Sequence, residues 1–266
     1  MSRLDATFQR LRERDERALV TFFTAGDPSL DVTERLIVEA DTRGADVIEL
    51  GVPFSDPIGD GPVNQRSSER ALRAGTNLVR VLETVSRVRE RVRAPLVFMT
   101  YYNPIYAFGL KAFARTAVDA GVDGLLVLDL PPEEATDLAA EAHVVDLDVI
   151  HMVAPTSTAP RLRLIARRSR GFIYVVSRTG VTGERADVPE DLGTQIRGLR
   201  RVTTKPICVG FGIATPEQVA MVGTLADGVI VGSAIVRLIE EHARSSTLVE
   251  DVGRFIADLK APLKKP

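Results

Sequence analysis

The chain has 266 residues, of which 45% are hydrophobic and 26% charged, and its formal net charge is -2. This length and apolar content predict one large domain or two small ones, and since no linker or change of composition divides the chain, we expect a single domain over residues 1–266. Because no apolar run approaches the roughly 18 to 20 residues that span a bilayer, and the first residues lack a signal-peptide core, we expect a cytoplasmic protein without a membrane partner.

Eight β-like runs alternate along the chain with segments of helical periodicity. They begin near residues 19, 46, 96, 123, 148, 172, 206 and 227. Eight β/α units at this length fit a closed (β/α)8 TIM barrel of the α/β class better than an open doubly wound sheet, for which roughly six strands or fewer is commoner.

Two intervals between strand starts are longer than the others. Most starts lie 21 to 27 residues apart, whereas the second and sixth intervals span 50 and 34 residues. The extra chain includes residues 55–61 and 177–189. In a barrel these segments are βα loops on the catalytic face, where long loops commonly close over a substrate.

A carboxylate interrupts the second β-like run. Glu49 stands among Val47, Ile48 and Leu50, although a buried unpaired carboxylate costs several kcal/mol or shifts its pKa. Asp60 follows in a loop rich in glycine and proline, which can bring a second acid over the first. Glu49 alone is equally consistent with a structural ion pair to an arginine, so both alternatives stay open at this point.

Three turns of small residues follow β-like runs in the second half of the chain. They lie at residues 177–183, 209–212 and 231–233. Glycines in such turns let backbone N–H groups approach an anion closely, and Ser233 begins an apparent helix, whose N-terminus favours phosphate. Three turns on successive strands, with a carboxylate pair on an earlier strand, predict a phosphate-binding active site.

The remaining reactive or charged residues are interpreted as structural. Cys208 is the only cysteine and lies in an apolar run, so we expect a buried inert thiol and no intrachain disulfide. Arginine-rich runs at 87–93 and 161–170 lie on helix-like segments of a slightly acidic chain, which favours solvated helix faces over a nucleic-acid partner. The three histidines, at 143, 151 and 242, lack metal-site spacing, and no metal is expected.

Several motifs together resemble the tryptophan synthase α subunit family over nearly the whole length. They lie at residues 22–28, 48–57, 101–104, 129–133, 177–183, 210–212 and 232–235. The ELGVPFSDP stretch followed by the SRTGVTG loop is a highly specific combination. The resemblance implies a TIM barrel with an extra N-terminal helix. It further implies retro-aldol cleavage of indole-3-glycerol phosphate to indole and glyceraldehyde 3-phosphate, with no cofactor or metal in this chain.

The resemblance also implies the catalytic roles. Glu49 matches an acid that protonates indole C3 and then serves the side-chain hydroxyl. Asp60 matches a carboxylate that accepts from the indole N–H and stabilises positive charge there. Thr182 matches a loop threonine that hydrogen-bonds Asp60, with an ordinary loop hydroxyl as the alternative.

The other implied substrate-binding positions surround the indole or hold the phosphate. Phe22, Tyr174 and Phe211 match an aromatic lining, and core filling is the alternative for Phe22 and Phe211. The phosphate-binding positions are Gly183, Gly212, Gly232 and Ser233.

Two residues depart from the family pattern. Gly59 replaces a usual alanine and is expected to loosen the loop. Asn64 replaces an aliphatic residue. Its amide either faces the indole pocket, where an unpaired polar group weakens substrate binding, or turns toward the neighbouring loop and packs beside Asp60.

The family works as an α2β2 assembly with a pyridoxal-phosphate (PLP) β subunit that receives the indole. Residues 56–57, 103–106 and 129–132 match regions that touch this partner. A partner-dependent lyase is the favoured interpretation. The alternatives are a stand-alone lyase that releases free indole, and a non-catalytic chain that only activates a β subunit, against which the intact Glu49 and Asp60 argue.

Overall fold

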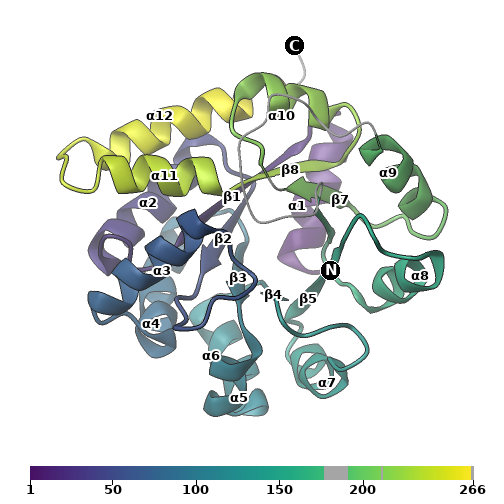
Figure 1. The fold of residues 1–266 in the computed structure, drawn as a ribbon, viewed down its shortest axis with the longest axis horizontal. Helices are drawn as coiled ribbons and strands as arrows, with labels where there is room; N and C mark the ends of the chain where they lie inside the picture. Colours follow the sequence, from purple (N-terminus) through teal and green to yellow (C-terminus); the bar gives the residue numbers. More distant parts are fainter. Residues whose placement is uncertain (177–190, 211, 265–266) are drawn as a thin grey trace.

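The computed structural model describes residues 1–176, 191–210 and 212–264, and it forms a closed barrel of eight parallel strands (Figure 1). The strands are β1 (Ala18–Thr24), β2 (Val47–Gly51), β3 (Leu96–Thr100), β4 (Gly124–Val127), β5 (Asp148–Val153), β6 (Ile173–Val176), β7 (Ile207–Gly210) and β8 (Gly228–Val231). Each strand pairs with the next, and β8 pairs with β1. The predicted TIM barrel is confirmed, and every strand begins within one residue of its predicted start.

Helices surround the barrel, except that the first helix lies behind the strands, inside the ring (Figure 1). They are α1 (Arg3–Glu13), α2 (Leu30–Arg43), α3 (Pro62–Arg73), α4 (Leu78–Val88), α5 (Tyr102–Phe108), α6 (Leu110–Ala120), α7 (Thr136–Val144), α8 (Ala159–Arg168), α9 (Leu192–Arg200), α10 (Pro216–Gly223), α11 (Ser233–Glu241) and α12 (Leu248–Lys260), with short 3-10 turns at Arg89–Arg91 and Ala261–Leu263. None of these helices is long and apolar enough to cross a membrane.

The expected extra N-terminal helix is α1. It begins with a capping box, in which the Ser2 hydroxyl accepts from the Asp5 N–H and the Asp5 carboxylate accepts from the Ser2 N–H. Its buried face carries Leu4, Phe8 and Leu11, which pack with the residues that fill the barrel interior. The helix therefore closes one end of the barrel, where its apolar face is hidden from water.

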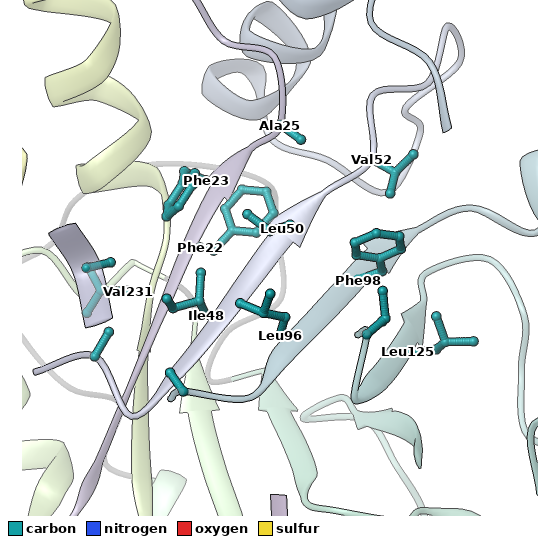
Figure 2. Packing of buried hydrophobic residues seen from close by; sticks show 14 of the residues in the cluster. Phe22, Phe23, Ala25, Ile48, Leu50, Val52, Leu96, Phe98, Leu125 and Val231 are labelled. Atoms are coloured by element: carbon teal, nitrogen blue, oxygen red, sulfur yellow. The ribbon is translucent and has the colours of Figure 1, made fainter. Parts of the chain in front are cut away.

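Strand residues alternate between two hydrophobic layers because successive side chains point to opposite faces of a strand. Val20, Val47 and Val97 lie in the interior cluster. Ile48 and Leu96 belong to the larger cluster between the sheet and the surrounding helices, where Figure 2 shows them on neighbouring strands. Burial of each such side chain contributes about 1.5 to 3 kcal/mol.

The long second interval between strands holds both a loop and an additional helix. Residues 52–61 connect β2 to α3, and α4 follows α3 before β3 begins. The loop predicted at 55–61 is therefore present, but much of the extra length is helical. The second predicted loop, at 177–189, lies outside the described residues.

Aspartates secure the N-terminal ends of three strands. Asp46 lies just before β2, and its Oδ2 accepts the backbone N–H of Leu19 in β1 at 2.8 Å. The same arrangement occurs before β4 and β8, where the bonded pairs are Asp123 with Leu96 and Asp227 with Ile207. A cation pairs with each carboxylate: Lys260 with Asp46, Arg89 with Asp123, and Arg200 with Asp227. These contacts lie at the N-terminal ends of the strands, opposite the catalytic face of a TIM barrel, so we interpret them as stabilising the fold.

Candidate active site

Glu49 lies in the middle of β2, between Phe22 of β1 and Val97 of β3 in the strand register. Its side chain is fully buried, and among the described residues neither carboxyl oxygen has a hydrogen-bond partner. The alternative of a structural ion pair with an arginine therefore has no support in this part of the chain. Burial, and secondarily the charge of Asp60, raises the pKa of Glu49 to about 8. Glu49 is accordingly a carboxylic acid with an available proton at neutral pH.

Asp60 lies in the loop between β2 and α3 and is 7% exposed. The hydroxyl of Tyr101 donates to Asp60 Oδ2 at 2.8 Å, and the Asn64 amide nitrogen lies 3.5 Å from Oδ1. Burial raises the pKa of Asp60, while the hydrogen bonds from Tyr101 and Asn64 oppose that rise. Asp60 thus has hydrogen-bond donors that favour its charged form. Glu49 has no such donor within the described residues.

The same tyrosine also holds the backbone of the loop. The Gly59 N–H donates to the Tyr101 hydroxyl at 2.9 Å, and Gln65 Nε2 donates to the Asp60 carbonyl at 2.8 Å. A Cβ atom at position 59 would lie 3.3 Å from the Tyr101 hydroxyl oxygen, so glycine eases this close approach. The looseness expected of Gly59 stays a prediction.

Asn64 occupies the second of its two anticipated positions, beside Asp60. Its amide nitrogen faces the carboxylate, whereas its Oδ1 is buried without a partner among the described residues. A buried unpaired carbonyl oxygen costs about 1 to 3 kcal/mol. Weaker substrate binding because of Asn64 stays a prediction.

Two aromatic residues of the predicted lining are described. Phe22 is 4% exposed, and Cβ atoms built at Gly51 and Gly232 would lie 2.9 and 3.1 Å from its ring. Tyr174 of β6 is buried, and its pKa is raised by burial and then by the charge of Glu49. Its hydroxyl therefore stays neutral in the part of the barrel that Glu49 occupies.

The described part of the predicted phosphate site lies after β7 and β8. Gly212 is exposed and has a φ of 77°, in the left-handed region that favours glycine. Gly232 precedes α11, and the exposed Ser233 is its first residue. The first N–H groups of a helix have no partner within the helix, so they are free to bind an anion. Three further predicted positions, Thr182, Gly183 and Phe211, lie outside the described residues.

Strand order explains how these residues come together. Because β8, β1, β2 and β3 are neighbours, the loops and side chains at their carboxyl ends share one face of the barrel. Gly232, Phe22 and Asp60 therefore converge on that face, and Tyr101 joins them directly after β3. The contact between Tyr101 and Asp60 was not anticipated from the sequence, although a polar aromatic residue at a strand end was a visible indication.

Comparison with known proteins gives a consistent result over the full chain. The family model described as "Tryptophan synthase alpha chain" matches residues 8–262. A tryptophan synthase alpha chain of Geobacter sp. (strain M21) is 50% identical over 265 residues, which cover 100% of this chain and 99% of that one. The alpha chain of Geotalea uraniireducens (strain Rf4) is 52% identical over 264 residues, which cover 99% and 98%.

Solved structures of tryptophan synthase have the same fold at lower sequence identity. Tryptophan synthase subunit alpha from Legionella pneumophila str. Paris superposes with a TM-score of 0.91 at 36% identity, covering 99% of this chain and 98% of that one. A chain of Mycobacterium tuberculosis tryptophan synthase gives a TM-score of 0.91 at 35% identity, covering 100% and 99%.

Proposed function

Because this chain belongs to the tryptophan synthase alpha chain family, we propose that Glu49 and Asp60 carry out its reaction. The chain is a carbon–carbon lyase of tryptophan biosynthesis, which cleaves indole-3-glycerol phosphate to indole and glyceraldehyde 3-phosphate. One observation supports the residue assignment above others: two buried carboxyl groups lie in one site, and only Asp60 has described hydrogen-bond donors. Such a difference in environment assigns a protonated acid and a charged, stabilising carboxylate to two similar groups.

Glu49 serves first as the acid. With its pKa raised to about 8, the carboxyl group is protonated at neutral pH and can donate to indole C3. The resulting carboxylate then removes the proton of the side-chain hydroxyl. As the carbonyl of glyceraldehyde 3-phosphate forms, the bond to C3 breaks, its electron pair returns to the ring, and Glu49 is left protonated as it began.

Asp60 stabilises the ring during these steps. Protonation at C3 places positive charge on the indole nitrogen, and a carboxylate that accepts from that N–H lowers the energy of the charged state. The hydrogen bonds from Tyr101 and Asn64 favour the ionised form of Asp60 that this role requires.

The remaining contacts bind the two ends of the substrate. Phe22 and Tyr174, with Phe211, would line the indole site, and Gly212, Gly232 and Ser233, with Gly183, would bind the phosphate. Thr182 would hold Asp60 when the loops close. Support comes from the family pattern and, for the described residues, from their place at the carboxyl ends of the strands.

Tryptophan synthase alpha chains have a β subunit as their partner, and we propose an α2β2 assembly for this chain. The PLP of the pathway's next step would belong to the β subunit, since the acid–base steps above use side chains alone. Exposed apolar side chains at Ile58 and Tyr106, 82% and 66% exposed, lie in or beside the segments matched to the partner contact. A cytoplasmic location stays a prediction from the sequence.

The test is indole release by the wild type and by Glu49→Gln, each alone and with a tryptophan synthase β subunit. The chain has no tryptophan, so indole fluorescence is readily followed. We expect release that rises with the β subunit and falls at least 100-fold in Glu49→Gln. The exposed residue Glu83 provides a matched control, because Glu83→Gln should leave release unchanged.

Other outcomes favour the alternatives. Equal release with and without the β subunit would support a stand-alone lyase. No release under either condition would support a chain that only activates its partner, and unchanged release in Glu49→Gln would refute the catalytic assignment.

A further inference from the structure

A cluster of four charged side chains connects three elements next to the site. Arg70 of α3 forms a two-pronged ion pair with Asp27, which lies in the segment after β1: Nε donates to Oδ1 at 2.8 Å and Nη2 to Oδ2 at 2.7 Å. Asp27 is 1% exposed, so its carboxylate depends on this pairing. The third Arg70 nitrogen, Nη1, donates to Glu240 Oε1 at 2.7 Å.

Glu240 is held by a second arginine as well. Arg66 lies one helical turn before Arg70, and it donates from Nε to Oε1 at 2.9 Å and from Nη2 to Oε2 at 2.8 Å. Glu240 belongs to α11, and helices α3 and α11 are in contact, as their neighbouring positions in Figure 1 indicate. Two arginines of α3 therefore form ion pairs with one carboxylate of α11.

These two helices begin at opposite ends of the proposed substrate site. Helix α3 starts at Pro62, two residues after Asp60, and α11 starts at Ser233, in the proposed phosphate site. The relative placement of the two helices thus sets the distance between the group that contacts the indole N–H and the groups that bind the phosphate. Because a short glycerol chain joins the indole to the phosphate, the substrate can make both contacts in a reactive geometry only over a narrow range of that distance.

We propose that Arg70 and Glu240 are positioning residues that fix α11 against α3, so that phosphate binding places the indole correctly against Asp60. The proposal rests on the proposed function, because it assumes the phosphate site at Gly232 and Ser233. Binding energy from a remote phosphate increases the rate only when it is used to hold the reacting bond in place. Loss of the ion pair should therefore remove part of the rate advantage that the phosphate gives.

Stability alone is a poor explanation for the ion pairs of Glu240. The Glu240 side chain is 28% exposed and the Arg66 side chain 51%, and ion pairs at such exposure contribute little to folding. A comparable ion pair joins Arg87 to Glu34, with side chains 51% and 21% exposed, between helices α4 and α2. The Arg87–Glu34 pair offers a matched control without a link to α3 or α11.

The test compares Glu240→Ala with the wild type, both in complex with the β subunit, on indole-3-glycerol phosphate and on the same compound without its phosphate. The quantity measured is the ratio of kcat/KM between the two substrates. We expect Glu240→Ala to lower this ratio about threefold to tenfold, with kcat/KM for the dephosphorylated compound unchanged. A purely structural defect would lower both values together and leave the ratio intact.

Two further variants sharpen the result. Glu34→Ala should keep the wild-type ratio of kcat/KM values. Arg70→Met should lower this ratio at least as much as Glu240→Ala, provided that urea unfolding shows the variant to be folded. A wild-type ratio near one would refute the phosphate site and the positioning role together. A high wild-type ratio that persists in Glu240→Ala would refute the positioning role alone.

Discussion

The two carboxyl groups of the site have opposite surroundings. Glu49 is enclosed without a described partner, which raises its pKa to about 8, whereas Asp60 receives a hydrogen bond from Tyr101 and a weaker one from Asn64. The described titratable groups that interact electrostatically with Asp60 are Glu49, Tyr101 and Tyr174, and no described cation contacts its carboxylate. Tyr101 is therefore the main described group that keeps the charge on Asp60.

The effect of removing the Tyr101 hydroxyl can be predicted from these contacts. In Tyr101→Phe, Asp60 loses a hydrogen bond to its charged form, worth about 1.5 to 3 kcal/mol, and the Gly59 N–H loses its acceptor. We expect kcat/KM at neutral pH to fall about tenfold to 100-fold. Because the pKa of Asp60 rises, the acid side of the pH–rate profile should move to higher pH.

The adjacent Tyr102 supplies the control. Its ring packs against that of Tyr106, so Tyr102→Phe removes a hydroxyl from the adjacent residue without changing the described hydrogen bonds of Asp60. An acid limb that stays at the wild-type pH in Tyr101→Phe would show that Tyr101 does not act through Asp60.

At the scale of elements, the aspartates at the strand N-termini join strands to helices. Lys260, near the end of α12, has a side chain only 4% exposed; its Nζ lies 2.8 Å from Asp46 Oδ2 and donates to the Arg17 carbonyl at 2.9 Å. Asp46 in turn accepts from the backbone of Leu19 in β1. One largely buried ion pair, with side chains 4% and 11% exposed, therefore connects the last helix with the first two strands.

Lys260→Met should leave the largely buried Asp46 carboxylate without its cation, with only the Leu19 N–H as a hydrogen-bond donor. We expect the free energy of unfolding, measured in urea, to fall by about 3 kcal/mol, while kcat of the folded protein is unchanged. Lys111→Met, at an exposed position of α6, should have no effect. Adding Asp46→Asn to Lys260→Met should restore part of the loss, and a cost of Lys260→Met below about 1 kcal/mol would contradict this account.

Elements were more predictable from the sequence than their contacts. Apolar runs bounded by turn residues placed every strand, because burial on both faces of a parallel barrel demands such runs. The second helix after β2 was not predicted, since a long interval can hold either loop or helix. Glu49 and Asp60 were found because a charge in an apolar strand is costly, whereas the Tyr101 contact depends on how a loop folds over the next strand.

Ion pairs between residues distant in the sequence could not be predicted either, because they too depend on how the elements pack. Arg70 pairs with Asp27 and Glu240, at separations of 43 and 170 residues. Periodicity identifies which face of a helix is polar, but the choice between several acidic partners depends on helix packing. The resemblance assigned chemistry to single residues and carried no information about this network.

At the scale of the whole molecule, Glu49 makes stability depend on pH. Its pKa is about 8 in the folded chain against an ordinary 4.5, so between these values the folded state binds a proton that the unfolded state has released. The contribution of Glu49 to stability should therefore fall as pH rises from about 4.5 to about 8, by on the order of 5 kcal/mol as an upper estimate.

Glu49→Gln removes this titration. We expect urea unfolding to show similar stabilities for the wild type and Glu49→Gln at pH 5, and a more stable variant at pH 8. Activity that depends on the acid form should decline over the same range near pH 8. An equal difference in stability at both pH values would show that Glu49 is not protonated in the folded chain.

Pairing of β1 with β8 has a consequence for how the protein is made. About 210 residues separate Ala18 from its partner Gly228, an interval that takes roughly 10 to 40 s to translate. During that time the edge of β1 that will meet β8 has no neighbour, and an unpaired strand edge can join another chain. The barrel therefore cannot close until β8 has been synthesised, and it is the arrival of this strand, rather than of any single helix, that gives the edge of β1 its partner.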